Sequence, residues 1–338
     1  MVKTEQGPGY GGAMLAQNFT LDKIDDLLVV PVYLDKGADG IFNSGDRLIF
    51  FAQGPISWSH DGKQFVHTRN TYSNFGYYFL TSDHGSAEEI AVQPVQNAAA
   101  TEVIRTYDAY QVHELDSINL IDRTGAEGGG REFYGEMFMP GATRNFRFRF
   151  SGLVASEPMS WSISVAAASS DASRFEIQMD NASTSVSLSG IPSSDFYTKA
   201  SAGSSVKTFS AEAGEQKTVA LTFRSSSPTA LGFLNYIELN AVCNLALTGN
   251  EPLCFRTKTG KDNSNYYQFV IGNATAETQV WDVTDKAAIT RMNTTFSAAD
   301  SQLRFTAQNT GIREYVAFNP QSATYLSPEK TADIEPQN

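Results

Sequence analysis

The stretch Asn145-Phe146-Arg147-Phe148-Arg149-Phe150 alternates aromatic and charged side chains. Successive side chains of a β-strand point to opposite faces, so the phenylalanines share one face and the arginines take the other. The stretch therefore predicts a strand that is buried on one side and exposed on the other.

The same alternation recurs through the middle of the chain, at 160–165, 175–180 and 219–223. Turn-forming residues separate these segments at short intervals, and helical periodicity is almost missing. We therefore predict an all-β protein built of tandem antiparallel β-sandwich modules. The strand order of the middle module resembles a galactose-binding-like jelly roll, and the Ser/Ala/Gly-rich stretch at 200–205 is expected to be a surface loop.

The chain is longer than one hydrophobic core usually allows, at 338 residues, so more than one domain is expected. We predict a β-rich N-terminal domain at 1–130, a β-sandwich at 131–252 and a small β domain at 253–338. The glycine-rich stretch 125–130 marks the first boundary because such stretches are flexible. One short helix is expected in the last domain, at 285–292.

Composition excludes several classes of protein. Hydrophobic residues make up 41% of the chain, enough for packed cores, so the chain is not intrinsically disordered. The net charge of −12 argues against nucleic acid and against anionic lipid as partners, because both require clustered Lys and Arg. No apolar run is long enough to predict a transmembrane segment. The amino-terminal residues lack the apolar core of a signal peptide, so if the parent protein is exported, its signal is expected upstream of them.

A segment that begins at Asp35 matches much of the spacing of a calcium-binding loop. Gly40 stands at loop position 6, where such loops turn sharply, and an apolar strand follows. Two positions depart from the EF-hand pattern: position 3 is Gly37, and position 12 is an aspartate, as in dockerin-like loops, where a glutamate is usual. We predict a structural Ca²⁺ site because all the ligands are hard oxygens, and the alternative is a turn with solvated carboxylates. The predicted ligands are the side chains of Asp35, Asp39, Asn43 and Asp46 and the backbone carbonyl of Ile41.

Residue types associated with catalysis are present, but not in catalytic spacing. None of the histidines falls in an H-E-x-x-H or H-x₃-H pattern, so a zinc site would have to join distant segments. No G-x-S-x-G elbow occurs. A Cys–His nucleophile is disfavoured because both cysteines lie in apolar, strand-like runs. The histidines are His60, His67, His84 and His113.

The two cysteines, Cys243 and Cys254, flank a turn-forming segment at 248–251. This spacing would place them opposite one another across a hairpin, within bridging distance. A disulfide that closes so short a loop would stabilise the fold by about 2–3 kcal/mol. Two buried free thiols are the alternative, and the spacing alone does not choose between them.

An ordered series of short blocks resembles the amino-terminal part of PorU-like sortases of the type IX secretion system. These sortases are gingipain-type cysteine peptidases of Bacteroidetes. The succession of the blocks extends over nearly the whole chain and is more specific than any one block. The blocks are 50–55, Trp58, 70–73, 77–81, His113-Glu114, 130–136, 235–240, 280–284 and 313–318.

The resemblance implies a parent protein that removes C-terminal sorting signals from secreted cargo and attaches the cargo to surface lipopolysaccharide. In that family a caspase-like domain with a catalytic His–Cys pair follows this region, so the chain is expected to be non-catalytic. The implied partners are the downstream peptidase domain, outer-membrane components of the secretion system and cargo proteins. The implied location is extracytoplasmic, at the outer membrane or cell surface.

A cell-surface carbohydrate-binding or adhesion module is the alternative function. The jelly-roll pattern favours it, and a glycan would then be the partner. Exposed aromatic side chains could stack on a sugar, although in β-rich folds they more often form core or cross-strand pairs. The aromatic candidates are Trp58, Tyr72, Tyr77 and Tyr78.

Overall fold

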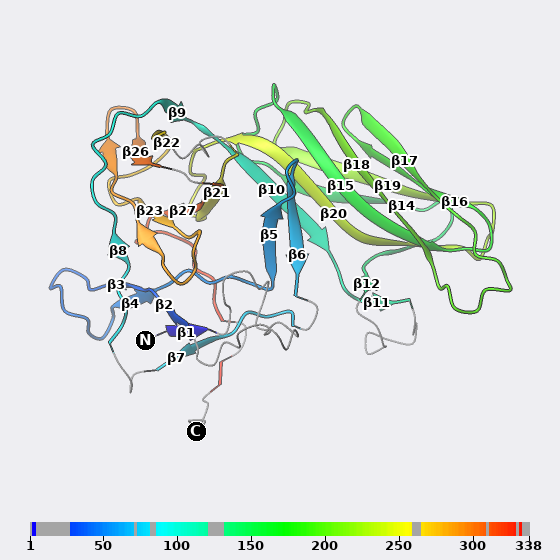
Figure 1. Ribbon diagram of the computed structural model, residues 1–338, viewed down its shortest axis with the longest axis horizontal. Coiled ribbons are helices and arrows are strands. Elements are labelled where there is room, and N and C mark those ends of the chain that lie inside the picture. Colours follow the sequence, from blue (N-terminus) through cyan, green and yellow to red (C-terminus); the bar gives the residue numbers. More distant parts are fainter. Residues whose placement is uncertain are drawn as a thin grey trace.

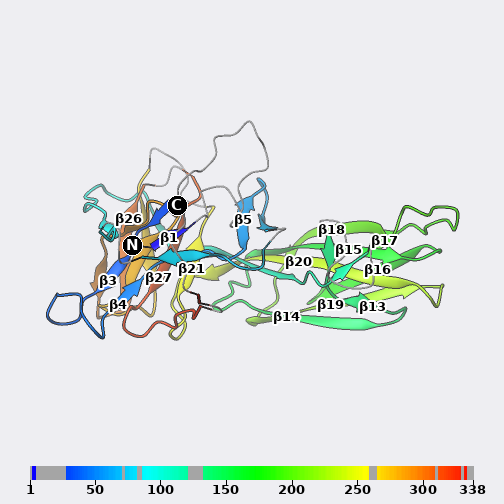
Figure 2. The ribbon, with the colours of Figure 1, turned by 90° about the horizontal axis from the view of Figure 1, so that it is seen from below.

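In the computed structural model, two β-sandwiches of unequal size follow one another along the long axis of the molecule (Figures 1 and 2). The structure describes residues 2–4, 28–70, 73–81, 86–120, 132–258, 265–308, 311–328 and 331–332. All the regular elements in these ranges are strands, so the predicted all-β class is confirmed. No helix that could cross a membrane occurs within these ranges.

The larger sandwich packs two antiparallel sheets face to face. One sheet has the order β10 (Thr106–Glu114), β20 (Leu231–Asn244), β15 (Pro158–Ala168) and β18 (Ser201–Ser210), with β13 (Met137–Phe138) also on β20. The other has the order β14 (Thr143–Arg149), β19 (Gln216–Ser225), β16 (Ser173–Met179) and β17 (Ala182–Leu188). A single apolar cluster from both sheets fills the space between them.

The alternating patterns are confirmed in this sandwich. Phe146, Phe148 and Phe150 are buried, whereas Arg147 and Arg149 are exposed. Strand β15 differs, because side chains on both of its faces are largely buried. Its inward face meets the opposite sheet. Its outward face is covered near Ser160 by a hairpin described below and near Ala166 by Leu120 and Tyr134.

The smaller sandwich uses strands from two distant parts of the chain. Its first sheet has the order β21 (Leu253–Arg256), β27 (Glu314–Phe318), β23 (Gln279–Asp282), β24 (Thr290–Arg291) and β8 (Ala91–Val92). Its second has the order β25 (Thr295–Ser297), β26 (Gln302–Ala307), β22 (Tyr267–Ile271) and β9 (Glu102–Ile104). The strands β8 and β9 join these sheets in parallel pairings, at β24 and β22.

The core of the smaller sandwich is aromatic. The rings of Phe269 and Phe305 stack with centroids 4.7 Å apart and an interplanar angle of 3°. Phe255 and Tyr315 stack on one another beside this pair, at 5.3 Å. Tyr107 contacts both this core and that of the larger sandwich, so the two hydrophobic cores adjoin.

Short strands on the amino-terminal side complete the fold. They form the sheet β2 (Leu28–Val30), β1 (Val2–Thr4) and β7 (Tyr78–Leu80), and the pairs β3 (Tyr33–Asp35) with β4 (Arg47–Ile49), β5 (Ile56–His60) with β6 (Phe65–Arg69), and β11 (Ile118–Asn119) with β12 (Phe133–Tyr134).

Two predictions of local structure are wrong. The predicted helix at 285–292 is a single turn, in which Ala288 N donates to Asp285 O at 3.1 Å, and the chain then pairs with β23 as β24. Ile289 is buried against the apolar cluster around Trp281, and this packing overrides the helical pattern. The stretch 200–205 is not a loop, since Ser201 begins the edge strand β18.

The three-domain division stays a prediction, because the proposed boundary at 125–130 lies outside the described residues. The pairings do show that residues 91–92 and 102–104 complete the sheets of the smaller sandwich, and that 106–114 belong to the larger one.

Candidate functional site

The hairpin formed by β5 and β6 lies across the outer face of the β10–β20–β15 sheet (Figure 1). The backbone of Phe65 exchanges two hydrogen bonds with the Asn240 side chain: its N–H donates to Oδ1 at 2.8 Å and its carbonyl accepts from Nδ2 at 3.0 Å. Ser160 donates to Gln64 at 3.1 Å. The hairpin is therefore docked by polar side chains of the sheet, around the fully buried ring of Phe65.

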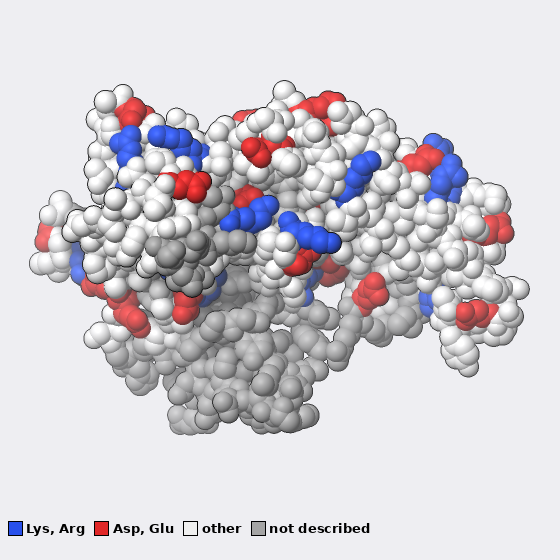
Figure 3. All heavy atoms as spheres, turned by 45° about the horizontal axis from the view of Figure 1, so that its top comes forward, with Lys and Arg blue, Asp and Glu red and all other residues white. Residues whose placement is uncertain are grey.

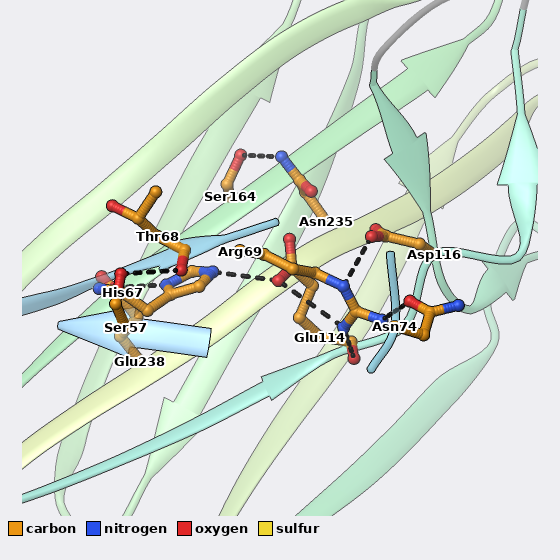
Figure 4. A network of polar contacts seen from close by, with 10 residues as sticks. All are labelled: Ser57, His67, Thr68, Arg69, Asn74, Glu114, Asp116, Ser164, Asn235 and Glu238. Atoms are coloured by element: carbon orange, nitrogen blue, oxygen red, sulfur yellow. Dashed lines mark hydrogen bonds and ion pairs between the residues drawn. The ribbon is translucent and has the colours of Figure 1, made fainter. Parts of the chain in front are cut away.

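His67 is the centre of this docking contact and lies between two carboxylates (Figure 4). Its Nδ1 is 2.5 Å from Glu238 Oε1, and its Nε2 is 3.0 Å from Glu114 Oε2. The backbone N–H of His67 also donates to Glu238, at 2.7 Å. All three side chains are at most 10% exposed. Although burial alone would lower the pKa of His67, the hydrogen bonds to Glu114 and Glu238 raise it to about 9. His67 is therefore an imidazolium that bridges two buried carboxylates at neutral pH.

Arg69 extends the network toward the end of β10. Its Nε forms an ion pair with Asp116 at 2.8 Å, and its guanidinium also donates to Asn74 at 2.9 Å and to the carbonyl of Glu114 at 3.3 Å (Figure 4). Burial and the neighbouring Glu114 raise the pKa of Asp116, and Arg69 opposes that shift. His67 and Arg69 thus bring two positive charges to three carboxylates: Glu114 and Glu238 on the sheet, and Asp116 just beyond the end of β10.

The other strand of the hairpin contacts the smaller sandwich. Trp58 Nε1 donates to Glu314 Oε1 at 2.9 Å, and Arg256 donates to the same oxygen at 2.9 Å. Lys286 donates to the second oxygen of Glu314 at 2.7 Å. Burial would raise the pKa of Glu314, but Lys286 and Arg256 together lower it. The Arg256 guanidinium also lies 4.5 Å from the centroid of the Trp58 ring. One hairpin therefore contacts both sandwiches. We call this contact region the hairpin junction; it consists of β5–β6 with Glu114, Glu238, Asn240, Arg256 and Glu314.

The polar contacts of the junction hold the hairpin in place, and their geometry does not suit catalysis. A general base must be unprotonated and reach a substrate, whereas His67 is protonated, buried and occupied on both ring nitrogens. Cys243 cannot serve as its nucleophile, because it is fully buried in the core on the opposite face of β20 from Glu238. Among the residues that the structure describes, no three His, Cys, Asp or Glu side chains form a metal site.

The predicted calcium loop folds around hydrogen bonds of its own. Asn43 donates from its backbone to Asp46 at 2.7 Å and from its amide to Asp39 at 2.9 Å and to the Ile41 carbonyl at 3.1 Å. Gly40, with a φ of 71°, makes the sharp turn. Asp35 lies apart from this group.

The carboxylate of Asp35 is held by Arg47 Nε at 3.1 Å and by Gln321 at 3.2 Å. These hydrogen bonds lower the pKa of Asp35, with the largest contribution from Arg47. The structure thus brings Asp39, Asn43 and Asp46 together but gives Asp35 a different partner. The Ca²⁺ site stays a prediction.

The predicted placement of the two cysteines across one hairpin is wrong, and of the two alternatives the structure has free thiols. Cys243 belongs to β20 of the larger sandwich and Cys254 to β21 of the smaller one. The segment between them is not a hairpin turn but the crossing from one sandwich to the other. Burial raises the pKa of the Cys243 thiol to about 12 and that of Cys254 to about 11, although the Cys254 side chain is the more exposed of the two.

The aromatic side chains proposed to stack on sugar do not form one platform. Arg256 covers the Trp58 ring, and the hydroxyl of Tyr78 accepts from the Gln53 backbone at 2.6 Å. Tyr77 is 48% exposed, and Tyr72 lies outside the described residues, as does His84.

The junction carboxylates were missed by sequence reasoning. Glu238 interrupts an apolar stretch in the strand 231–244. Side chains on both faces of this strand are largely buried. An acidic residue in such a run signals that the second face of the strand is covered and that the carboxylate has a partner. That partner, His67, is distant in sequence and carries no such signal.

Comparison with known proteins identifies a fold but not a family. No family model matches the chain, and no curated protein matches it. Among solved structures, the chain is similar to dimeric latent PorU from Porphyromonas gingivalis, with a TM-score of 0.77 and 21% identity. The match covers 96% of this chain and 29% of that one, so the chain spans less than a third of the length of PorU.

Two other matches are partial. A carbohydrate-binding module, CBM36, in complex with calcium and xylotriose covers 40% of this chain at a TM-score of 0.23. The insecticidal δ-endotoxin Cry8Ea1 from Bacillus thuringiensis covers 30% at 0.24. Both scores are too low to support an argument. Over nearly its whole length, the chain has the fold of the corresponding part of PorU.

Proposed function

We propose that this chain is a non-catalytic, amino-terminal accessory region of a PorU-like sortase of the type IX secretion system. The observation that carries the proposal is the similarity to PorU over 96% of the chain at a TM-score of 0.77. The ordered blocks of sequence that resemble the family add support, because they run through both sandwiches. The coverage of only 29% of PorU is what an accessory region of a larger protein would give.

The contribution of this region is to position a downstream peptidase domain. The hairpin junction supports this role because it ties the two sandwiches together through buried ion pairs and hydrogen bonds. A support of this kind holds a catalytic domain at a fixed place relative to its partners. Those partners are outer-membrane components of the secretion system and cargo proteins, at the cell surface. The parent protein then removes sorting signals and attaches the cargo to lipopolysaccharide.

The test is a deletion in the bacterium that carries the gene. The full-length parent is compared with a form that lacks this region, and cargo proteins are examined by mass spectrometry for retained C-terminal sorting signals. We expect cargo to keep its signals when the region is absent. A matched control carries Arg147→Gln, an exposed substitution on β14, and should process cargo normally. Normal processing without the region, or a gene that encodes no peptidase domain after it, would overturn the proposal.

A further inference from the structure

The strand β18 (Ser201–Ser210) has an open backbone edge, because it pairs with β15 alone. In an antiparallel sheet the N–H and C=O of one residue point to the same neighbouring strand, and successive residues alternate. Leu245 N donates to Arg105 O, so the odd residues of β20 face β10 and its even residues face β15. Followed across the ladder, this alternation turns the odd residues of β18 toward β15. The residues whose backbone groups point out of the sheet, without a hydrogen bond in the described part of the chain, are Ala202, Ser204, Val206, Thr208 and Ser210.

This open edge lacks the features that usually shield an edge strand. Charged side chains, prolines, bulges or a covering element normally do so. β18 contains no proline, and its register with β15 is uninterrupted. Its one charged side chain, Lys207, is folded under the strand, where Nζ donates to the Ser183 carbonyl at 2.6 Å and lies 5.9 Å from the centroid of the Trp161 ring. The side chains beside the open backbone groups are uncharged, and Val206 among them is 64% exposed.

The other edge strands of the larger sandwich are shielded. β17 lies beneath β18, and the Ser183 carbonyl on it is bound by Lys207. On β14, Gln111 donates to the carbonyl of Arg149, and Arg147 adds an exposed charge. β10 has acidic residues toward both of its ends. They are Asp108 and Glu114.

We propose that β18 pairs with β18 of a second copy of this chain, antiparallel and about a two-fold axis between the two copies of Val206. In this register all the open residues of one copy meet those of the other. Val206 opposes itself, Ser204 opposes Thr208, and Ala202 opposes Ser210. The pairing adds about ten backbone hydrogen bonds and joins the two sheets into one that continues across both molecules.

The side chains suit this register. On the exposed face, a pair of valines is flanked by serine–threonine pairs, and both combinations stabilise neighbouring strands. On the inner face, Gly203 opposes Phe209 of the second copy, and an aromatic ring opposite an edge glycine covers the bare backbone. Lys207 opposes Ser205 rather than its own copy, so no like charges are directly opposed. The strand is therefore complementary to itself.

A second copy fits this edge better than a charged partner does. The open residues carry no charge, and basic and acidic side chains are interspersed over the face shown in Figure 3, without a broad patch of one sign. Because the pairing uses the open edge of both copies, it closes at two. Strand addition buries less surface than a standard interface, so we expect a dissociation constant in the micromolar range or weaker. The inference does not depend on the proposed sortase function, since it rests on β18 alone.

Sedimentation equilibrium of the purified full chain over a wide range of concentrations tests the pairing. We expect a monomer–dimer equilibrium. Val206→Pro should weaken it at least about tenfold, because the N–H groups of both copies are lost from the new ladder. The same substitution should leave the melting temperature of the dilute monomer nearly unchanged, since proline is tolerated where the N–H faces solvent at an edge. Val206→Thr keeps the N–H and the branched side chain and should dimerise like the unmodified chain.

Val206→Lys and Val206→Glu test the two-fold register. Each variant alone should associate at least about threefold more weakly than the unmodified chain, because like charges are directly opposed at residue 206. An equimolar mixture should associate more tightly than either variant alone. The control Val103→Lys, at an exposed valine of β9, should behave like the unmodified chain.

Four results would overturn the proposal. They are an unmodified chain that stays monomeric at every concentration, association that Val206→Pro leaves intact, a charge-swapped mixture no tighter than its components, and assemblies larger than two copies.

Discussion

Replacement of His67 by alanine is the sharpest test of the hairpin junction. The substitution removes the cation that lies 2.5 Å from Glu238 and 3.0 Å from Glu114. Two carboxylates, exposed by only 3% and 10%, would then face one another with Arg69 3.9 Å from Glu114 as the remaining cation. Loss of one member of a buried ion pair costs about 3–5 kcal/mol, and we expect a fall of that size in the free energy of unfolding at pH 7.

The effect of His67 must depend on pH in a defined direction. The pKa of His67 is about 9 in the folded protein against 6.5 in an unfolded chain, so the folded state binds its proton more tightly. The corresponding stabilisation of about 3 kcal/mol is fully present below pH 6.5 and is lost as the pH rises through about 9. The difference between the unmodified chain and His67→Ala should therefore be large at pH 6 to 7 and much smaller at pH 10.

Urea unfolding followed by tryptophan fluorescence measures this difference, because Trp58 lies in the hairpin itself. His60→Ala is the matched control: His60 is in the same hairpin and packs on Phe65 at 5.1 Å, without a carboxylate partner among the described residues. It should cost about 1 kcal/mol, because the ring contact with Phe65 is lost. A loss below about 1 kcal/mol for His67→Ala at pH 7, or a difference that stays constant up to pH 10, would refute the reasoning.

Four further outcomes are expected. Calcium added to chelator-treated protein should raise its melting temperature, and Asp39→Ala should abolish the rise; absence of binding heat and of any rise would leave the loop as a plain turn. Asp180→Asn should cost about 3 kcal/mol in urea unfolding, because Lys217, 1% exposed, would lose the carboxylate at 2.6 Å; a cost near zero would contradict this. A thiol reagent should modify Cys254 before Cys243, because Cys254 is exposed and Cys243 is buried, although burial raises the pKa of both thiols, to about 11 and about 12; equal rates in the native protein would count against the structure. The purified chain should not hydrolyse a sorting-signal peptide; hydrolysis abolished by Cys243→Ala or Cys254→Ala would show the opposite.

Several strands of the larger sandwich were predictable because each buries one face in the core and exposes the other. Phe146 and Phe148 alternate with arginines, and the period of two leaves no other placement. Strand β18 was not predictable in the same way. Its Gly203 lies against Val186 and Leu188, where an added Cβ would come within 2.9 Å of both, so the position requires a residue that strand propensities disfavour.

Contacts between distant segments account for the other misses. The Cys243–Cys254 spacing predicts a hairpin only if both residues stay in one sheet, and the chain instead changes sandwich between them. The junction around His67 depends on how a hairpin near residue 60 docks on strands at 114 and 238, and local patterns carry no information on that docking. His67 lies in none of the blocks of the family resemblance, whereas the residues that it and the hairpin contact fall within separate blocks. These are Glu114, Glu238, Asn240 and Glu314.

The parallel pairing of β9 with β22 has a consequence for the order of folding. Thr101 donates to the carbonyl of Tyr266, a contact between residues 165 positions apart. The partners in the pairing of β8 with β24 are separated by even more of the sequence. As the chain lengthens from its amino terminus, these early strands have bare edges until the last quarter of the chain is available. Bare edges invite pairing with the wrong chain. A chaperone bound to residues 91–104 would therefore protect an incomplete chain from such pairing. A fragment that ends near residue 250 should aggregate rather than fold as a shortened protein.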